Sequence, residues 1–97
     1  MRNIKLSNRD IEFSGRFDKQ LQQAPDELKA AFRETLGLFL VDSSHPALRN
    51  HALTGKFAGY RSIDVTEDWR AVFREERIGE RRVIKFYQLG THEHLYG

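Results

Sequence analysis

Three strand-like segments follow one another closely in the C-terminal part of the chain, and they limit the fold more than any other feature. They cover residues 60–65, 69–74 and 82–89. Each segment alternates polar and apolar residues or is rich in β-branched and aromatic ones, as a strand with a buried face does. The connections 66–68 and 75–80 are short, so consecutive strands are expected to run antiparallel. The sequence therefore predicts an antiparallel meander.

A strand and a first helix are expected before this meander. Residues 10–14 alternate polar and apolar side chains, which predicts a short strand. Ser14 is a favourable N-cap for a helix in which Phe17 and Leu21 lie four residues apart. Pro25 ends this helix and suits the first turn of another one.

The second helix is predicted from apolar residues that recur at three- and four-residue steps between Leu28 and Leu40. The Pro-containing segment 41–46 ends it. The element order is therefore strand, helix, helix, strand, strand, strand. We expect a single small α+β domain over residues 1–97, in which an N-terminal strand and a two-helix hairpin pack on an antiparallel sheet. One face of the sheet would then stay open for a ligand.

Composition excludes several functional classes. The chain contains no cysteine, which rules out disulfides, thiolate catalysis and cysteine-bound zinc. No apolar run is long enough to cross a bilayer, and the N-terminus has no apolar signal core, so we expect a cytoplasmic protein without membrane contact. The 16 Lys and Arg residues exceed the 14 Asp and Glu residues only slightly. A nucleic-acid partner therefore depends on where the cations lie.

Titratable and aromatic residues follow the last predicted strand directly. Chemistry is often presented where a strand ends, so we expect His92 and Tyr96 to form one wall of a site. The strand itself raises a difficulty, because Ile84 and Phe86 have the spacing of core residues and Gln88 shares their parity. Either the site lies beyond the packed part of the strand, or a bulge changes the phase.

Four short motifs occur in a characteristic order. They are Asn-His-Ala-Leu-Thr-Gly at 50–55, Gly-Tyr-Arg at 59–61, Asp-Trp-Arg at 68–70, and Gly-Thr-His at 90–92 with Leu-Tyr-Gly at 95–97. Together they resemble the toxins of type II toxin–antitoxin systems, specifically the YafQ-like group of the RelE/ParE superfamily. The resemblance implies a ribosome-dependent endoribonuclease that cleaves messenger RNA without a cofactor or metal. It also implies a cognate antitoxin protein as a partner, besides the ribosome and messenger RNA.

The resemblance implies roles for individual residues. His92 matches the histidine that the family uses for proton transfer, and His51 matches a second active-site histidine. The remaining matches are an acid and an aromatic residue at the hairpin turn, a terminal aromatic residue, and two strand cations: Asp68, Trp69, Tyr96, Arg70 and Arg61.

Two positions depart from the family pattern. Gln88 stands where YafQ-like proteins have an active-site arginine, and Asp64 stands where they have a third histidine. Both changes work against binding a phosphodiester. Either Arg70 and Arg61 supply the missing positive charge, or the activity is weaker or altered.

The residue types also suit RNA cleavage on chemical grounds. A base must take the proton of the 2′-hydroxyl, an acid must protonate the leaving 5′-oxygen, and cations must stabilise the phosphorane. Histidine suits both proton transfers, and arginine suits the phosphate. The candidate set is His92, His51, Asp68, Arg70 and Tyr96 for catalysis, with Arg61, Lys56, Trp69 and Gln88 for substrate binding. The aromatic members would stack on unpaired bases.

Other interpretations stay open at this point. The alternatives are a ParE-like toxin that binds gyrase and cuts nothing, or a member that keeps antitoxin binding with weakened catalysis; the histidine pair favours the endoribonuclease, since a pure binder has no evident need for it. Individual residues also have structural explanations: Trp69 as part of the core, Asp68 as a turn residue, and His51 as a backbone-bonded loop residue.

Overall fold

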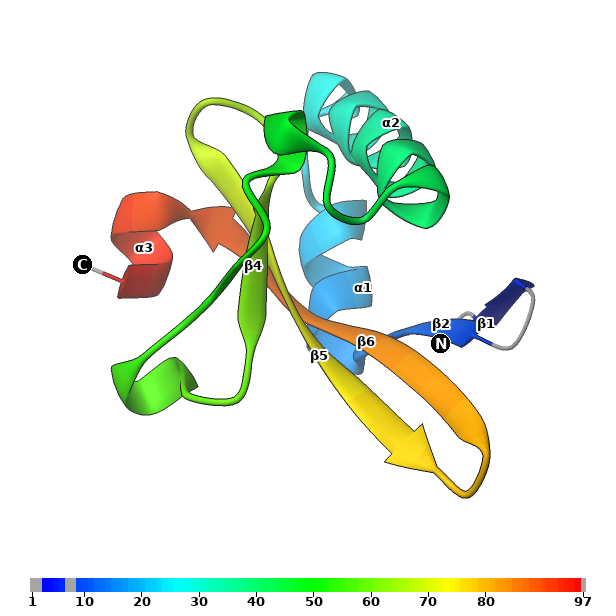
Figure 1. The fold of residues 1–97 in the computed structure, drawn as a ribbon. Coiled ribbons are helices and arrows are strands. Elements are labelled where there is room, and N and C mark those ends of the chain that lie inside the picture. Colours follow the sequence, from blue (N-terminus) through cyan, green and yellow to red (C-terminus); the bar gives the residue numbers. More distant parts are fainter. Residues whose placement is uncertain (1–2, 7–8, 97) are drawn as a thin grey trace.

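The computed structural model describes residues 3–6 and 9–96 (Figure 1). Its elements in chain order are β1 (Asn3–Leu6), β2 (Arg9–Phe13), α1 (Gly15–Gln22), α2 (Asp26–Val41), the 3₁₀ turn η1 (Pro46–Leu48), β3 (His51–Ala52), the 3₁₀ turn η2 (Gly55–Phe57), β4 (Arg61–Asp64), β5 (Trp69–Ile78), β6 (Arg81–Thr91) and α3 (His92–Tyr96). Gly97 of the terminal motif lies outside the described residues. The predicted α+β class is confirmed.

The strands form one mixed sheet in the order β1-β2-β6-β5-β4-β3. The predicted meander is confirmed, because β4, β5 and β6 are antiparallel neighbours. The expectation of a wholly antiparallel sheet is wrong for the N-terminal strand: β2 runs parallel to β6. The helical crossover α1–α2 between β2 and the meander makes this orientation possible. The short strand β1 was not predicted.

The hairpin of β5 and β6 is longer than its sequence suggested. The segment 75–80 was expected to be a charged turn, but β5 continues to Ile78 and only Gly79 and Glu80 form the turn. Gly79 adopts a φ of 63°, a conformation that glycine takes without strain. The hairpin accommodates these charged residues because oppositely charged side chains pair between its two strands, as Arg82 does with Glu75.

Helices α1 and α2 cover one face of the sheet (Figure 1). The core between them contains six of the seven phenylalanines: Phe13, Phe17, Phe32, Phe39, Phe73 and Phe86. The ring of Phe86 lies at the centre, with its centroid 5.4–5.9 Å from those of the other five. Burial of these large rings is the main stabilising contribution in so small a core.

Ser14 caps α1 as predicted, and it also ties the helix to the sheet. Its Oγ accepts a hydrogen bond from the Phe17 backbone N–H at 3.0 Å. The same hydroxyl donates to the carbonyl oxygen of Tyr87 at 2.9 Å. The start of α1 is therefore held beside the middle of β6.

A β-bulge in β6 changes the phase of that strand. Phe86 is paired with Phe73, but Gln88 is paired with Val72, which leaves Tyr87 as an extra residue. Such an insertion shifts the alternation by one residue. Phe86 therefore faces the helices and Gln88 faces the opposite side of the sheet. This is the second of the two solutions that the parity problem allowed.

The face opposite the helices is only partly open. Segment 46–60 and helix α3 lie on that side (Figure 1). Helix α3 was not predicted from the sequence. Ser62 and Val72, which point to this face of the sheet, are fully buried. The expectation that this face stays open is therefore wrong: the face is partly covered, and only hollows remain open to a ligand. No helix within residues 3–6 and 9–96 is long and apolar enough to cross a membrane.

Candidate active site

The end of β6 is fixed to the turn before β5 at the point where the candidate residues begin. His92 is the first residue of α3, and its backbone N–H donates to the carbonyl oxygen of Asp68 at 3.0 Å. Leu95 anchors the helix, since it is 3% exposed and packs against Gly90. The His92 side chain itself stays exposed.

Tyr96 connects α3 to the rest of the site. Its ring centroid lies 4.9 Å from that of His92, with the rings 70° apart, as expected for neighbours one helical turn apart. Its hydroxyl donates to Ser62 Oγ on β4 at 2.9 Å. The predicted pair of His92 and Tyr96 is therefore brought together.

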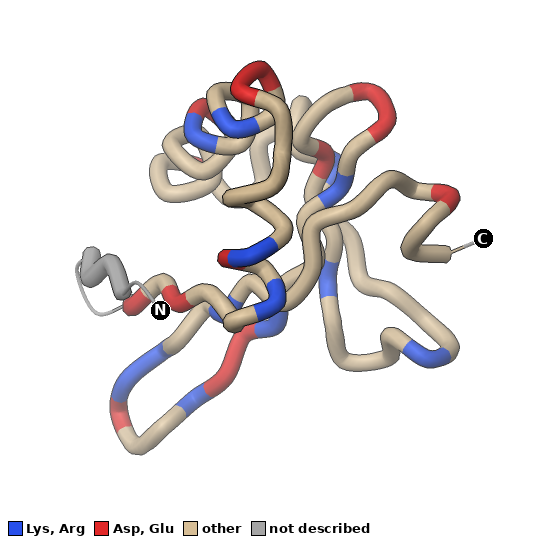
Figure 2. The backbone as a smooth tube through the Cα atoms, turned by 180° about the vertical axis from the view of Figure 1, so that it is seen from behind, with Lys and Arg blue, Asp and Glu red and all other residues tan. Residues whose placement is uncertain are grey.

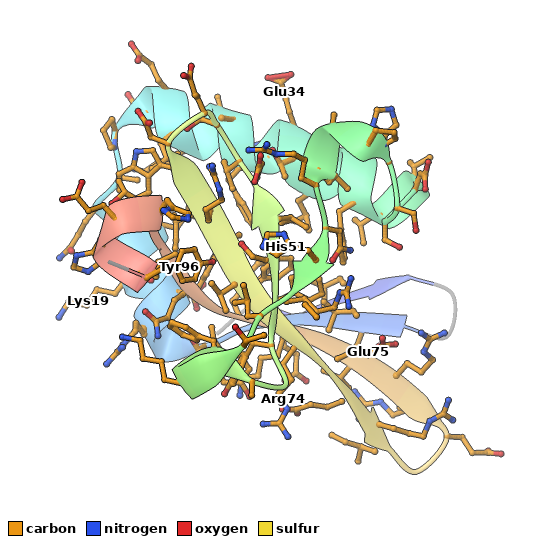
Figure 3. The ribbon with its side chains drawn as sticks, turned by 60° about the vertical axis from the view of Figure 1, so that its left-hand side comes forward. Lys19, Glu34, His51, Arg74, Glu75 and Tyr96 are labelled. Carbon is orange, nitrogen blue, oxygen red and sulfur yellow. The ribbon has the colours of Figure 1, made fainter. Side chains whose placement is uncertain are left out.

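His51 lies on the same face, because β3 pairs with β4 and places His51 directly opposite Ser62. The positions of His51 and Tyr96 can be followed in Figure 3. The Nδ1 atom of His51 is 2.7 Å from the carbonyl oxygen of Arg49. Since a carbonyl only accepts, Nδ1 carries the proton, and the neutral ring keeps a lone pair on Nε2.

Asp64 is not an isolated negative charge. Its carboxylate accepts a hydrogen bond from Arg49 Nε at 2.6 Å and forms an ion pair with Arg70 Nε at 3.0 Å, and its side chain is 15% exposed. Arg49 itself follows η1 with a left-handed φ of 46°. Two arginines therefore offset the anion that seemed to oppose phosphate binding.

The structure corrects the environment expected for Arg70. This residue is 8% exposed, and its guanidinium donates to the carbonyl oxygens of Thr66, Glu67 and Trp69 at 2.9–3.0 Å, besides its bond to Asp64. These contacts stabilise the turn before β5. Most of the donors that would bind a phosphate are thus occupied by the protein itself.

Arg61 and Arg70, the two strand cations that could have supplied the missing charge, do not lie together. Arg61 is paired with Phe73 and Arg70 with Asp64, so the pleat directs the two arginines to opposite faces of the sheet. Arg61 is half-buried and donates from Nε to Asn50 Oδ1 at 2.8 Å. Neither arginine replaces the charge missing at Gln88.

Asp68 and Trp69 lie beside His92. Together with Thr91 and Glu93 they line a hollow of about 490 Å³. Trp69 is half-buried and packs against the core, so only part of its ring is available to a ligand. The sequence placed these two residues at the hairpin turn correctly, and it allowed for the core role of Trp69.

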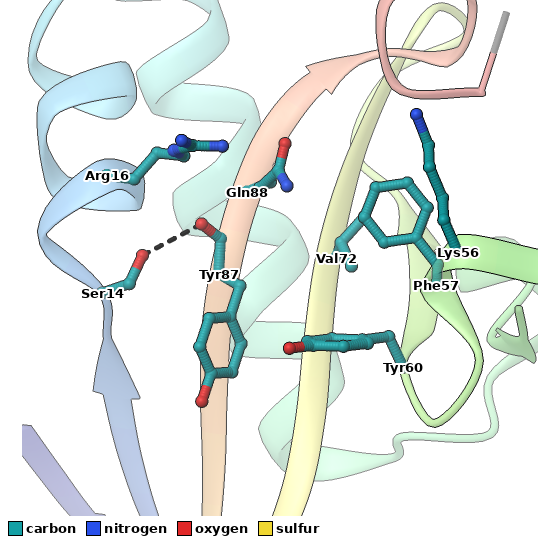
Figure 4. A pocket seen from close by; sticks show the side chains of 8 residues that line it. All are labelled: Ser14, Arg16, Lys56, Phe57, Tyr60, Val72, Tyr87 and Gln88. Carbon is teal, nitrogen blue, oxygen red and sulfur yellow. Dashed lines mark hydrogen bonds between the residues drawn. The ribbon is translucent and has the colours of Figure 1, made fainter.

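A second hollow, of about 340 Å³, contains Lys56 and Gln88 (Figure 4). The other residues that line it were not identified from the sequence: Ser14, Arg16, Phe57, Tyr60, Val72 and Tyr87. Figure 4 shows Arg16 on one side of Gln88 and Lys56 with Phe57 on the other. Arg16 and Lys56 thus bring positive charge near Gln88. Arg16 gave no signal because it comes from α1, far away in sequence.

The second hollow and the histidines are linked by aromatic contacts. Phe57 lies with its ring centroid 5.8 Å from that of Tyr96, which in turn contacts His92. On the far side, Tyr87 donates from its hydroxyl to Glu76 at 2.9 Å. Burial and this hydrogen bond raise the pKa of Tyr87 to about 12.

Charges of both signs are spread over the molecule. Figure 2 shows Lys and Arg interspersed with Asp and Glu along the chain rather than gathered on one element. Among the described residues, no three His, Asp or Glu side chains are grouped so that they could hold a metal ion. The candidate active site is therefore defined by local cations and aromatic rings, not by a strongly charged face.

Comparison with known proteins gives one family. Residues 9–97 match the family model described as bacterial toxin of type II toxin–antitoxin system, YafQ. The chain is 29% identical over 96 residues to the mRNA interferase toxin YafQ of Escherichia coli strain K12, an alignment that covers 95% of this chain and all of the relative.

Solved structures agree with this match. The crystal structure of YafQ from E. coli BL21(DE3) superposes with a TM-score of 0.72 at 25% identity, over 92% of this chain and 99% of that one. The toxin in the E. coli DinJ–YafQ toxin–antitoxin complex gives 0.71 at 25% identity, over 94% and 100%. A YoeB/ParE toxin from Agrobacterium tumefaciens shares the fold, with a TM-score of 0.68 at 16% identity over 84% and 97% of the two chains.

Proposed function

The chain belongs to the YafQ family of bacterial toxins of type II toxin–antitoxin systems, and from this premise we propose that it is an endoribonuclease that cleaves messenger RNA on the ribosome. The observation that carries the proposal is the convergence at Tyr96. Its ring contacts His92, and its hydroxyl binds Ser62, the residue opposite His51. Two histidines on one face provide the proton donor and the proton acceptor that metal-free RNA cleavage needs.

In the proposed reaction, His51 Nε2 takes the proton from a ribose 2′-hydroxyl, and the resulting oxygen attacks the adjacent phosphorus. The bond from phosphorus to the 5′-oxygen breaks, and His92 in its protonated form delivers a proton to that oxygen. The products are a 2′,3′-cyclic phosphate and a 5′-hydroxyl. Each proton transfer typically contributes about a hundredfold to ten-thousandfold in rate.

The other residues of the site bind substrate in this proposal. Arg16 and Lys56 lie on either side of Gln88 and contribute the positive charge that Gln88 lacks. Arg70 acts as a positioning residue, since its contacts hold the turn that carries Asp68 and Trp69. Tyr96 keeps the His92 ring in place.

We expect a cognate antitoxin to neutralise the protein. The homologous E. coli YafQ has been solved in a complex with DinJ, and the alignment covers 94% of this chain and 100% of that one. A cognate antitoxin would likewise keep the present protein inactive in the cytoplasm until that antitoxin is lost.

Primer extension on cellular messenger RNA after induced expression tests the proposed activity. We expect discrete cuts that disappear when translation is blocked before induction. Cuts that persist under the block would refute the dependence on ribosomes but not the nuclease activity. Intact message in arrested cells would refute the nuclease activity and favour a protein target such as gyrase.

A further inference from the structure

The hollow around Gln88 is built from aromatic rings set at right angles. The rings of Phe57 and Tyr60 have centroids 6.2 Å apart at 85°, and those of Tyr60 and Tyr87 lie 5.3 Å apart at 86°. Val72, fully buried, forms part of its lining. Rings in this arrangement offer both a face and an edge to a flat ligand, which gains by stacking against them.

Gln88 contributes an amide to this hollow that has no hydrogen-bond partner among the described residues. The residue is half-buried. The hydroxyl of Ser14, by contrast, is occupied by Phe17 and Tyr87. A free amide presents two donor hydrogens and an acceptor oxygen side by side, the pattern that matches the edge of a nucleobase.

Cations stand on both sides of the amide. Arg16 is exposed and forms no ion pair within the described part of the chain. Lys56 is also exposed, and its Nζ lies 5.5 Å from the centroid of the Phe57 ring. In nucleic-acid complexes such cations bind backbone phosphates, while amides and rings bind the base.

We propose that this hollow binds one unpaired nucleobase of the RNA substrate and that the amide of Gln88 selects which base it is. The inference rests on the proposed function, because that function makes RNA the ligand. The contact between Phe57 and Tyr96 places the hollow next to the histidines, so the bound base belongs to a nucleotide close to the scissile bond. Neither a free phosphate nor an acidic peptide requires three rings and an unpartnered amide.

Binding is tested with the full-length ¹⁵N-labelled protein and the four nucleoside 5′-monophosphates, which contain no phosphodiester to cleave. We expect at least one nucleotide to shift the side-chain amide signals of Gln88 and the backbone signals of Phe57 and Tyr60. Tyr60→Leu should weaken that binding about tenfold or more through lost stacking. Inorganic phosphate should shift only signals near Arg16 and Lys56. Equal responses to phosphate and to all nucleotides would overturn the proposal.

Selectivity is tested by mapping cut sites of Gln88→Glu, which replaces the amide donor with a second acceptor. We expect cleavage at sites with guanine to rise about fivefold to a hundredfold relative to cleavage at other sites, because the N1–H and N2–H groups of guanine suit a carboxylate. Gln22→Glu, the same change on an exposed residue of α1, should leave the pattern unchanged. An unchanged pattern in Gln88→Glu, with a uniform fall at all sites, would overturn the selective role.

The two proposals fail in different ways. Nucleotide binding at Gln88 without any cleavage of messenger RNA would overturn the nuclease and leave the base site standing. Cleavage by a protein whose hollow ignores all four nucleotides would overturn the base site alone. The hollow would then be a surface for a protein partner, which would be seen as protection of the same signals in the antitoxin complex.

Discussion

His51 and His92 are held in different ways, although both are exposed on the same face of the sheet. His51 is fixed through Nδ1 by the Arg49 carbonyl, so its neutral tautomer is set. The His92 ring contacts the Tyr96 ring, and that contact ties neither ring nitrogen. A fixed acceptor suits the base, and a ring that can carry protons on both nitrogens suits the acid.

His92→Ala should lower messenger RNA cleavage about a hundredfold to ten-thousandfold, because it removes one proton-transfer group. The side chain is exposed, so the melting temperature should not change. His94→Ala provides the matched control, since it removes an exposed histidine from the same helix. Primer extension together with thermal unfolding separates the two variants. Full activity in folded His92→Ala would exclude this residue from the chemistry.

Tyr87 should make stability depend on alkaline pH. Its pKa is about 12 in the folded protein, above the ordinary value of 10.0, because of burial and the bond to Glu76. The folded state therefore keeps this proton over a range in which the unfolded chain loses it. The stabilising contribution is complete below pH 10 and is lost as the pH rises toward 12.

Denaturant unfolding of the wild type and of Tyr87→Phe at several alkaline pH values measures this effect. We expect the free energy of unfolding of the wild type to fall more steeply than that of Tyr87→Phe between pH 10 and 12. Parallel curves for the two proteins would show that the hydroxyl is not shielded as the structure indicates.

At the scale of elements, local signals predicted more than long-range ones did. The cap at Ser14, the helix Asp26–Val41 and the meander follow from neighbouring residues, and all were predictable. The bulge was predictable only as one of two solutions, because parity alone does not fix where an extra residue enters a strand.

What sequence reasoning missed depends on segments that meet only in the folded chain. The pairing of Arg70 with three carbonyl groups and the approach of Arg16 to Gln88 have no local pattern. Helix α3 is five residues long, too short to show a helical period. The structure brings His92, Tyr96 and His51 of the candidate set to one face, and it adds Arg16 to the predicted Lys56 as a cation beside Gln88.

Gly90→Ala should displace α3. An added Cβ would lie 3.1 Å from two atoms of Leu95, which is buried and cannot move freely. The helix that carries His92 and Tyr96 would shift. Because these groups would then be misplaced, we expect the rate of cleavage to fall about tenfold or more. The free energy of unfolding should fall by only about 1–2 kcal/mol.

Gly37→Ala is the control for this substitution. An added Cβ there meets nothing within 4 Å, and Gly37 lies exposed within α2. It should raise the free energy of unfolding by about 0.5–1 kcal/mol and leave cleavage unchanged. Equal activity of the two variants would mean that the position of α3 does not limit the reaction.

Arg70→Ala should destabilise the fold by about 2–3 kcal/mol, because it leaves Asp64 with a single partner and removes the bonds to the turn. A thermal unfolding curve, together with cleavage measured at several temperatures, distinguishes this structural role of Arg70 from phosphate binding. If the role is structural, activity should return at temperatures where the variant is folded. Inactivity of a fully folded Arg70→Ala protein would contradict it. Arg33→Ala, an exposed arginine on α2, should change neither quantity.

For the whole molecule, the net charge of +2 is small and the cations are dispersed, so an acidic partner must engage particular sites. We expect the product of the neighbouring reading frame to form a stable complex and to restore growth on co-expression. Its association rate should fall as salt rises, while its dissociation rate changes little, since electrostatic steering acts mainly on encounter. Binding kinetics at several salt concentrations check this, and a neighbour that neither binds nor protects would remove the antitoxin from the proposal.

The bulge at Tyr87 has a consequence for how such a chain tolerates insertions and deletions. Removing Tyr87 would let Gln88 follow Phe86 directly, so Phe86 would still face the helices and Gln88 would still face the site. The loss would be confined to the Tyr87 ring in the hollow and its hydrogen bond to Glu76. Removing a residue from a regularly paired part of β6 would instead turn the residues on one side of the gap to the wrong face, so the strand tolerates a deletion at the bulge better than anywhere else along its length.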